Sequence, residues 1–330
     1  LGIETSCDET AASVVRGGTA ISSSVTASSL RLHSRYGGII PEIASRAQLE
    51  YINFVVDQAL KRAHIAIDDV GLIAVTRGPG LIGSLLVGIS FAKALSYAKR
   101  IALVGVDHVQ AHLYAAFLNR HSSVPVRFPF VGLVVSGGHT RLYYYKKFDT
   151  FQVLGDTLDD AAGEAFDKVA KLLDLGYPGG PAIERCAKKG NPRAYRFNCG
   201  DPRTCEFSFS GVKTAVLYAI QEIKRRDALS GQQKSDLAAS FQASVISALV
   251  QKTINVLVRR KAKTLVVGGG VVANKSFRRE LLQKSAEFGI NVLIPRFELC
   301  TDNASMIAGL GYQLYRLGKR DDLHFKPCLY

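Results

Sequence analysis

The sequence has few of the features that mark disulfide-rich or disordered proteins. Its six cysteines, at positions 7, 186, 199, 205, 300 and 328, form no C-x-x-C pair. This spacing is too sparse for a disulfide scaffold. Cys199 and Cys205 are near enough to bridge within one loop, but we expect a reducing cytoplasm instead. The absence of a Ser/Pro-rich tail or a single-residue tract argues against disorder.

Little in the sequence suggests a membrane or an export signal. The most apolar long stretch, residues 81–98, contains Lys93 and several Gly and Ser residues. We therefore expect it to form a buried helix and not a membrane span. Leu1 already lies in a strand-like run, without the charged and apolar regions of a secretory leader. The expectation is a cytoplasmic protein with no membrane contact.

Two common nucleotide-binding motifs are missing, although glycine-bearing turns are present. No segment matches the Walker pattern G-x-x-x-x-G-K-[ST], and none opens a Rossmann helix with G-x-G-x-x-G. Short turns nevertheless follow strand-like runs at residues 4–8, 136–139 and 268–270. Glycine lets a backbone approach a ligand closely, and successive N–H groups cradle phosphate oxygens. One Gly pair is usually only a hairpin turn, but the set of turns favours a nucleotide site.

Positive charge exceeds negative charge by a wide margin. The net charge is +14, with 42 Lys and Arg against 28 Asp and Glu. A polyanionic partner, nucleic acid first, is therefore expected, although many basic proteins bind no polyanion and that alternative stays open. Residues 191–205 are predicted to form a polar surface insertion. Basic residues are dense in and around it and on two later segments: Lys188, Lys189, Arg193, Arg196 and Arg203, then 224–226 and 259–261.

Strands and helices alternate along the chain, as in α/β proteins. Expected strands span residues 1–4, 11–15, 70–76, 101–106, 130–136, 139–147 and 264–267. Expected helices span residues 47–63, 81–99, 160–173, 211–226, 235–260, 274–288 and 302–317. The strand, polar turn and strand that open the chain recur at residues 130–147, which suggests an ancient duplication.

The length of 330 residues predicts about two domains. We place an N-terminal lobe at residues 1–107. A second lobe, at residues 108–330, is predicted to carry the metal and nucleotide cleft, with its last helix packing back on the first lobe.

His108 and His112 form the most informative pair in the sequence. The i,i+4 spacing places both imidazoles on one helical face, where they can reach a single cation, and neutral imidazole suits Fe and Zn about equally. Asp302 precedes a predicted helix and is placed to supply a third ligand. Two histidines without a ligand role, and an Asp302 that only caps its helix, remain the alternatives. Val109 occupies the position of the glutamate in H-E-x-x-H, so the general base of the zinc proteases is missing.

Many ordered motifs across the chain resemble one family. They are G-I-E-T-S-C-D-E-T at 2–10, G-I-I-P-E at 38–42, T-R-G-P-G-L at 76–81, V-S-G-G-H-T at 135–140, Y-P-G-G-P at 177–181, F-S-F-S-G-V-K-T at 207–214 and G-G-G-V-V-A-N at 268–274. With the histidine pair, they identify a resemblance to the tRNA N6-adenosine threonylcarbamoyltransferase family, also called TsaD or Gcp, in its bacterial form.

The resemblance implies a fold and a set of site residues. The fold is α/β and two-lobed, of the actin/hexokinase-like (ASKHA) type, with duplicated ribonuclease-H-like cores. The metal, Fe(II) or else Zn, is bound by His108, His112 and Asp302. Glu184 stands where the family often has Asp. The residues implied in binding the donor are Val134, Val135, Ser136, Gly137, Gly138, Asp167, Gly180, Glu184 and Asn274.

The same resemblance implies a reaction and partners. The threonylcarbamoyl group passes from threonylcarbamoyl-AMP to N6 of the adenosine next to the anticodon, in tRNAs that read codons starting with A. The implied partners are tRNA, an inactive TsaB-like paralogue and a small TsaE-like ATPase. Competing readings are a metalloprotease (O-sialoglycoprotein endopeptidase), an ATPase or sugar kinase of the same fold, and a non-catalytic nucleic-acid-binding protein. No residue presents itself as a general base, and Cys7 and Glu9 have no assigned step.

Overall fold

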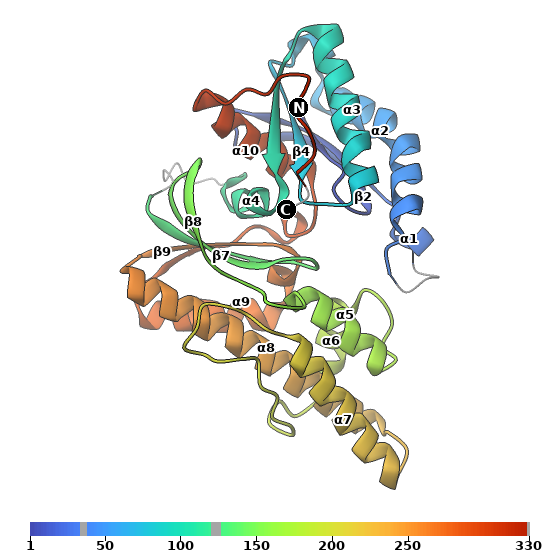
Figure 1. Ribbon diagram of the computed structural model, residues 1–330, viewed down its shortest axis with the longest axis vertical. Coiled ribbons are helices and arrows are strands. Elements are labelled where there is room, and N and C mark those ends of the chain that lie inside the picture. Colours follow the sequence, from blue (N-terminus) through green and yellow to red (C-terminus); the bar gives the residue numbers. More distant parts are fainter. Residues whose placement is uncertain (34–37, 120–126, 329–330) are drawn as a thin grey trace. The chain divides into compact units, whose positions relative to one another are not determined.

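The chain forms two compact units, drawn in Figure 1. A computed structural model describes residues 1–33, 38–119 and 127–328. Unit 1 comprises Leu1–Val126 and Pro295–Tyr330, and unit 2 comprises Arg127–Ile294. This division differs from the expected boundary after residue 107, because helix α4 (His108–Tyr114) continues directly from strand β5 and packs within unit 1. The closing segment from Pro295 also belongs to unit 1.

Unit 1 is built on a mixed five-stranded sheet in the order β3-β2-β1-β4-β5. Strands β1, β2 and β3 pair antiparallel, whereas β1, β4 and β5 run parallel. The parallel strands are almost wholly buried, which explains their continuous apolar sequence. The strands are β1 (Gly2–Glu4), β2 (Glu9–Arg16), β3 (Ala20–Ser28), β4 (Leu72–Gly78) and β5 (Ala102–Asp107).

Helices cover both faces of this sheet. Helix α2 (Pro41–Ala63) packs on β2 and β3, and α3 (Ile82–Lys99) packs on β4. Helix α10 (Ala304–Arg316) packs on β1, β2, β4 and β5, on the opposite side of the sheet from α2 and α3 (Figure 1). The short elements are α1 (Leu30–His33) and the 3-10 turns η2 (Ile67–Asp69), η3 (Ala115–Phe117) and η5 (Phe297–Leu299).

Glycines let α10 lie unusually close to the sheet. A Cβ on Gly2 would stand 2.2 Å from the carbonyl oxygen of Ala304, and one on Gly311 would stand 2.4 Å from the Cβ of Ala74. No side chain fits at such distances, so a larger residue would push the helix away from the strands. The position of the start of α10 is thereby fixed against β1.

Unit 2 repeats the sheet of unit 1. Its order is β10-β9-β6-β7-β8, with β6, β7 and β8 antiparallel and β6, β9 and β10 parallel. The repeat of strand, turn and strand that the sequence indicated is thus confirmed in the topology. The strands are β6 (Phe130–Val135), β7 (Thr140–Lys147), β8 (Thr150–Asp156), β9 (Thr264–Gly268) and β10 (Asn291–Leu293).

Helix α8 (Gly231–Arg260) is the central helix of unit 2. Ser230 and Gln233 form a capping box at its start, and it packs on α6, α9 and β6. By length and composition α8 could cross a membrane, but 61% of its apolar window is buried in the structure, which fits a core helix. The other helices are α5 (Ala162–Leu172), α6 (Gly179–Ala187), α7 (Ser210–Arg226), η4 (Gly270–Ala273) and α9 (Lys275–Glu287).

Candidate metal centre and glycine-rich turns

The histidine pair lies on one helix, at the end of a parallel strand. Asp107 ends β5 and caps α4, since its carboxylate accepts a hydrogen bond from the N–H of Gln110 at 2.8 Å. The side chains of His108 and His112 are both buried, and their ring centroids lie 4.7 Å apart. The i,i+4 spacing read from the sequence therefore does bring the two imidazoles together.

Asp302 completes a group of three possible ligands. Its Oδ1 lies 3.2 Å from Nε2 of His112 and 3.6 Å from Nε2 of His108. The N-cap of α10 is the neighbouring Asn303, whose side chain accepts from the N–H of Met306 at 3.0 Å. The capping alternative for Asp302 is therefore wrong. All three residues belong to unit 1, although the sequence placed the metal in the second lobe.

The donor atoms of this group suit a single metal ion. One ligand atom from each of the three residues lies within 4.8 Å of the others. Ligands bonded to one ion at about 2.1 Å stand roughly 3 to 3.5 Å apart at octahedral to tetrahedral angles. Both ring nitrogens of His112 are buried and make no hydrogen bond to the described residues, which is costly unless something else binds them. A cation held by two imidazoles and a carboxylate removes that cost.

Glu4 is a member of this centre that sequence reasoning missed. Its carboxylate is fully buried and lies 2.9 Å from Nδ1 of His108, with the hydroxyl of Thr76 donating at 2.7 Å and the N–H of Ser6 at 2.5 Å. An acceptor at Nδ1 favours the tautomer that leaves Nε2 free for a metal. The available signal was an acid inside the buried strand β1.

Electrostatics couple the buried groups. Burial disfavours the charged form of His108, but the carboxylates of Glu4 and Asp302 outweigh it and raise the pKa of His108 to about 9. Burial likewise opposes ionisation of Glu4, yet the facing His108 and the Ser6 hydrogen bond keep the pKa of Glu4 below its ordinary value. A metal that binds this centre would displace a proton.

Two further acids, Asp8 and Glu9, lie next to one another at the start of β2. Burial is the largest cause that raises the pKa of Glu9 to about 8, and the carboxylates of Asp8 and Asp302 add to it. Burial also raises the pKa of Asp8. Glu9 is therefore mostly protonated near neutral pH in the metal-free protein.

The first glycine turn of unit 2 presents free backbone donors. The turn after β6 is closed by the N–H of Ser136, which donates to the carbonyl of His139 at 2.8 Å. The N–H groups of Gly137 and Gly138 have no acceptor among the described residues, and a Cβ at either position would meet no atom within 4 Å. Gly163 in the first turn of α5 lies against this turn, so a helix N-terminus faces the same region.

The glycine turn at residues 268–270 lies close to the turn at residues 136–139, because the strands that precede them, β9 and β6, are neighbours. Val134 pairs with Gly268 across β6 and β9, and a Cβ on Gly269 would lie 2.4 Å from the carbonyl oxygen of Val135. The side chains of Val134 and Val135 are fully buried. Both residues are paired within the sheet, so they shape the floor of the turn and expose no side chain to a ligand.

The remaining expected donor-site residues already have protein partners, apart from one glycine. Asp167 accepts from the N–H of Gly179 at 2.7 Å, and Glu184 accepts from the N–H of Lys275 at 2.8 Å. Gly180 has open space at its Cβ position. Asn274 caps α9 through Phe277 and donates to Gln242 at 2.7 Å. In this structure Asp167, Glu184 and Asn274 hold helix starts in place.

Comparison with known proteins decides the family. The family model described as TsaD, tRNA N6-adenosine threonylcarbamoyltransferase, matches residues 20–309. A relative of that name from Caldicellulosiruptor bescii is 50% identical over 314 residues, covering 94% of this chain and 91% of the relative. One from Bacillus cereus is 49% identical over 329 residues, covering 98% and 93%. The chain belongs to the tRNA N6-adenosine threonylcarbamoyltransferase family.

Solved structures support the fold. HypF from T. kodakarensis aligns with a TM-score of 0.64 at 14% identity, covering 96% of this chain and 48% of that one. The activator of 2-hydroxyisocaproyl-CoA dehydratase from Clostridium difficile aligns with a TM-score of 0.50 at 12% identity, covering 96% and 95%. The predicted two-lobed ASKHA fold and the predicted family of tRNA-modifying transferases are both confirmed.

Proposed function

We propose that this chain transfers the threonylcarbamoyl group of threonylcarbamoyl-AMP to N6 of the adenosine next to the anticodon, in tRNAs that read codons starting with A. The observation that carries the proposal is the group formed by the buried His108 and His112 and the half-buried Asp302, in a chain of the tRNA N6-adenosine threonylcarbamoyltransferase family. A metal held there would act as a Lewis acid and template for the oxygens of the donor.

Fe(II) is the metal that we propose, with Zn as the alternative. Two imidazoles and one carboxylate form the donor set typical of non-haem Fe(II) sites with open positions. Among the described residues, the group contains no cysteine, which disfavours a structural zinc site. The open positions are the ones that a substrate oxygen would take.

The backbone of unit 2 supplies the phosphate site in this proposal. The N–H groups of Gly137 and Gly138 are free to donate, and the start of α5 adds the positive end of a helix dipole. Asp167, Glu184 and Asn274 hold the starts of α6 and α9 in place, and Gly180 leaves room for the nucleotide. Val134 and Val135 support the turn from the buried strand β6.

The transfer itself follows from the chemistry of the donor, a mixed anhydride of a threonine carbamate and AMP. The adenosine N6 forms a bond to the carbamoyl carbon, the C–O bond to the phosphate breaks, AMP leaves and N6 loses one proton. Hydrogen bonds from Gly137 and Gly138 would stabilise the charge that develops on the leaving phosphate. Positioning of the two substrates supplies much of the remaining rate.

Two structural details favour transfer over the competing functions. Val109 is fully buried, so the position that would carry the general base of an H-E-x-x-H protease faces the core. Kinases and ATPases bind Mg²⁺ through carboxylates and substrate phosphates, so they do not need a centre of two histidines and one aspartate. A metal-dependent transferase uses both the centre and the glycine turns.

We further propose that the chain works in the cytoplasm with a TsaB-like paralogue and a TsaE-like ATPase. tRNA as the substrate is consistent with that compartment. Cys199 and Cys205 are not bridged to one another, as expected of a reducing environment.

A reconstituted transfer assay tests the proposed function. Purified chain, loaded with Fe(II) or Zn, would be incubated with unmodified tRNA, threonylcarbamoyl-AMP and the two helper proteins. Mass spectrometry of the digested tRNA should show one threonylcarbamoyl-adenosine per tRNA, and metal analysis should give one ion per chain. An unmodified tRNA with every component present would reject the proposal.

A further inference from the structure

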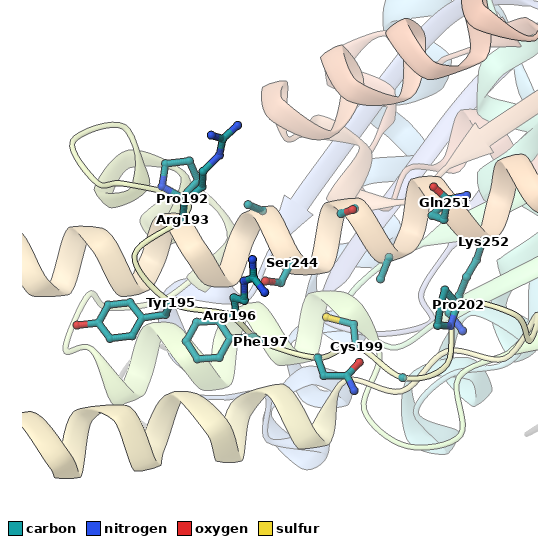
Figure 2. Close-up of a pocket in the computed structure, with 15 residues that line it drawn as sticks. Pro192, Arg193, Tyr195, Arg196, Phe197, Cys199, Pro202, Ser244, Gln251 and Lys252 are labelled. Atoms are coloured by element: carbon teal, nitrogen blue, oxygen red, sulfur yellow. The ribbon is translucent and has the colours of Figure 1, made fainter.

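The 191–205 loop of unit 2 runs along α8 and forms a pocket with it. The pocket has a volume of about 620 Å³ and is lined by the loop and by α8 residues from Ala243 to Lys252. Figure 2 shows Arg193 and Arg196 rising from the loop in the same direction, with the rings of Tyr195 and Phe197 side by side below them. None of the lining residues is acidic.

The loop has a defined shape although it contains no helix or strand. At its start, the N–H of Asn191 donates to Asp236 at 2.7 Å, and the N–H of Tyr195 donates to the hydroxyl of Ser240 at 3.2 Å. Both acceptors lie on α8. These bonds satisfy loop backbone groups with side chains of a rigid helix, so the residues between them are held in one conformation.

A buried lysine anchors the other end. Lys252 is 2% exposed, and its ammonium donates to the carbonyl oxygens of Asp201 and Glu206, each at 2.6 Å, and to Thr204. Its ammonium group is therefore occupied by hydrogen bonds to this segment and is not available to a ligand. The positive charge that the pocket offers comes from Arg193 and Arg196.

These two arginines have no partner in the described protein. Both are exposed, and no described residue makes an ion pair or a side-chain hydrogen bond with either guanidinium. By contrast, the exposed Arg225 and Arg226 on α7 both pair with Glu222. A pre-shaped pocket with two unpaired guanidinium groups and no acid favours an anionic ligand.

The aromatic rings narrow the class of anionic ligand that fits the pocket. Tyr195 and Phe197 are half-buried and stack with their ring centroids 6.2 Å apart and their planes 12° from parallel. Protein sites for single-stranded nucleic acid combine such features, because bases stack on half-buried rings and phosphates bind free guanidinium groups. An acidic polypeptide would use the arginines but would gain little from the rings.

We propose that this pocket binds an unpaired nucleotide of the tRNA, with its phosphate on Arg193 and Arg196 and its base against Tyr195 and Phe197. The inference rests on the proposed function for the identity of the RNA. It adds a contact that serves affinity for the tRNA and not the transfer step.

Binding of unmodified tRNA to the full chain, measured over a series of salt concentrations, tests the arginines. Each phosphate contact to a single strand contributes about 0.7 to the slope of log affinity against log salt. Because the proposal places one phosphate on this pair, Arg193→Glu/Arg196→Glu should weaken binding and lower the slope by about 0.7. The matched control is Arg225→Glu/Arg226→Glu, which changes the net charge equally. If both double variants lose the same affinity for tRNA, only net charge matters, and the pocket is rejected as a binding site.

A second measurement tests the rings. Tyr195→Ala/Phe197→Ala should weaken binding of a short unpaired RNA by about five- to a hundredfold, with little change in salt slope. Binding of a duplex RNA of the same length should hardly change. If poly-glutamate competes for the pocket as well as the unpaired RNA does, an acidic protein is the better occupant, and the proposal of a bound nucleotide is rejected.

Transfer assays separate this inference from the proposed function. If the pocket binds tRNA as proposed, the variants should raise the KM for tRNA and keep kcat at saturating tRNA, with unchanged binding of the adenylate. An unchanged KM in an active enzyme would reject the pocket alone. A parent chain that modifies no tRNA would reject the proposed function, while the RNA-binding measurements would still decide what the pocket binds.

Discussion

Glu4 and His108, which stand 104 positions apart in the sequence, meet in the core of unit 1 with Oε2 and Nδ1 2.9 Å apart. The contact orients the ring whose other nitrogen faces Asp302. Since Glu4 contacts a ligand and not the metal position itself, we assign it a positioning role.

Glu4→Gln should lower metal affinity by about 10- to 100-fold, the usual effect of removing such an outer partner. The amide can keep only part of the hydrogen bonding and carries no charge to support the imidazole. Competition titration with a metal-binding dye measures the affinity directly, without any activity assay. The control is Glu42→Gln on the exposed face of α2. Parent-like affinity in Glu4→Gln would remove Glu4 from the centre.

His112→Ala should abolish stoichiometric metal binding and transfer while the fold persists. The ring nitrogens of His112 make no hydrogen bond in the described structure, so the substitution removes only the 3.2 Å contact of Nε2 with Asp302 and leaves a small cavity behind. Metal analysis and circular dichroism provide the two readouts. His324→Ala, at an exposed histidine of the same unit, is the matched control. Full metal occupancy in His112→Ala would contradict the assignment.

Gly137→Val should weaken binding of the adenylate or of ATP far more than it lowers the thermal midpoint. The position has open space around it, so a valine meets no protein atom but occupies the region in front of the turn's N–H groups. Isothermal calorimetry gives the affinity. Gly71→Val, also at a glycine with open surroundings but in unit 1, controls for the added side chain. Equal nucleotide affinity in Gly137→Val and the parent would exclude the turn as a phosphate site.

The free energy of unfolding of metal-free protein should fall as pH rises from about 4.5 towards 8, with Glu9 as one cause. The pKa of Glu9 is about 8 in the folded state against an ordinary value of 4.5. In this window the folded state therefore binds a proton that the unfolded chain has released, and stability decreases with rising pH. Glu9→Gln should flatten this dependence, whereas Glu50→Gln, at an exposed acid of α2, should leave it unchanged. Urea unfolding at several pH values measures both.

Periodic and strongly apolar segments could be predicted from the sequence. Most expected helices and parallel strands agree with the structure within a few residues, as for α3, which was expected at 81–99 and spans Ile82–Lys99. Strands β3 and β8 were missed because they carry many polar or small residues and are largely exposed, so no apolar run marks them. Helix α6 was missed because it is short and begins with Gly179 and Gly180.

The candidate site was only partly readable from the sequence. Local spacing was enough to group His108 with His112, because both lie on one helix. The role of Glu4 depends on a contact between strand β1 and helix α4, which no local pattern encodes. The unit boundary was misjudged for a similar reason, since the packing of α4 and α10 is a long-range contact. The Asn303 cap shows how a shift of one residue decides whether Asp302 is free to bind a metal.

The repeated sheet topology assigns different chemistry to two copies of one hairpin. In the first copy, β1 ends at Glu4, a buried acid that contacts the proposed metal ligand His108. In the second copy, β6 ends at Val135, and the turn that follows offers unpaired N–H groups at Gly137 and Gly138. The two copies of one hairpin thus present opposite polarity, a buried carboxylate in one and unpaired backbone donors in the other. Under the proposed function, one hairpin would support a cation and its twin would receive an anion, so a single topology would serve both charges of the reaction.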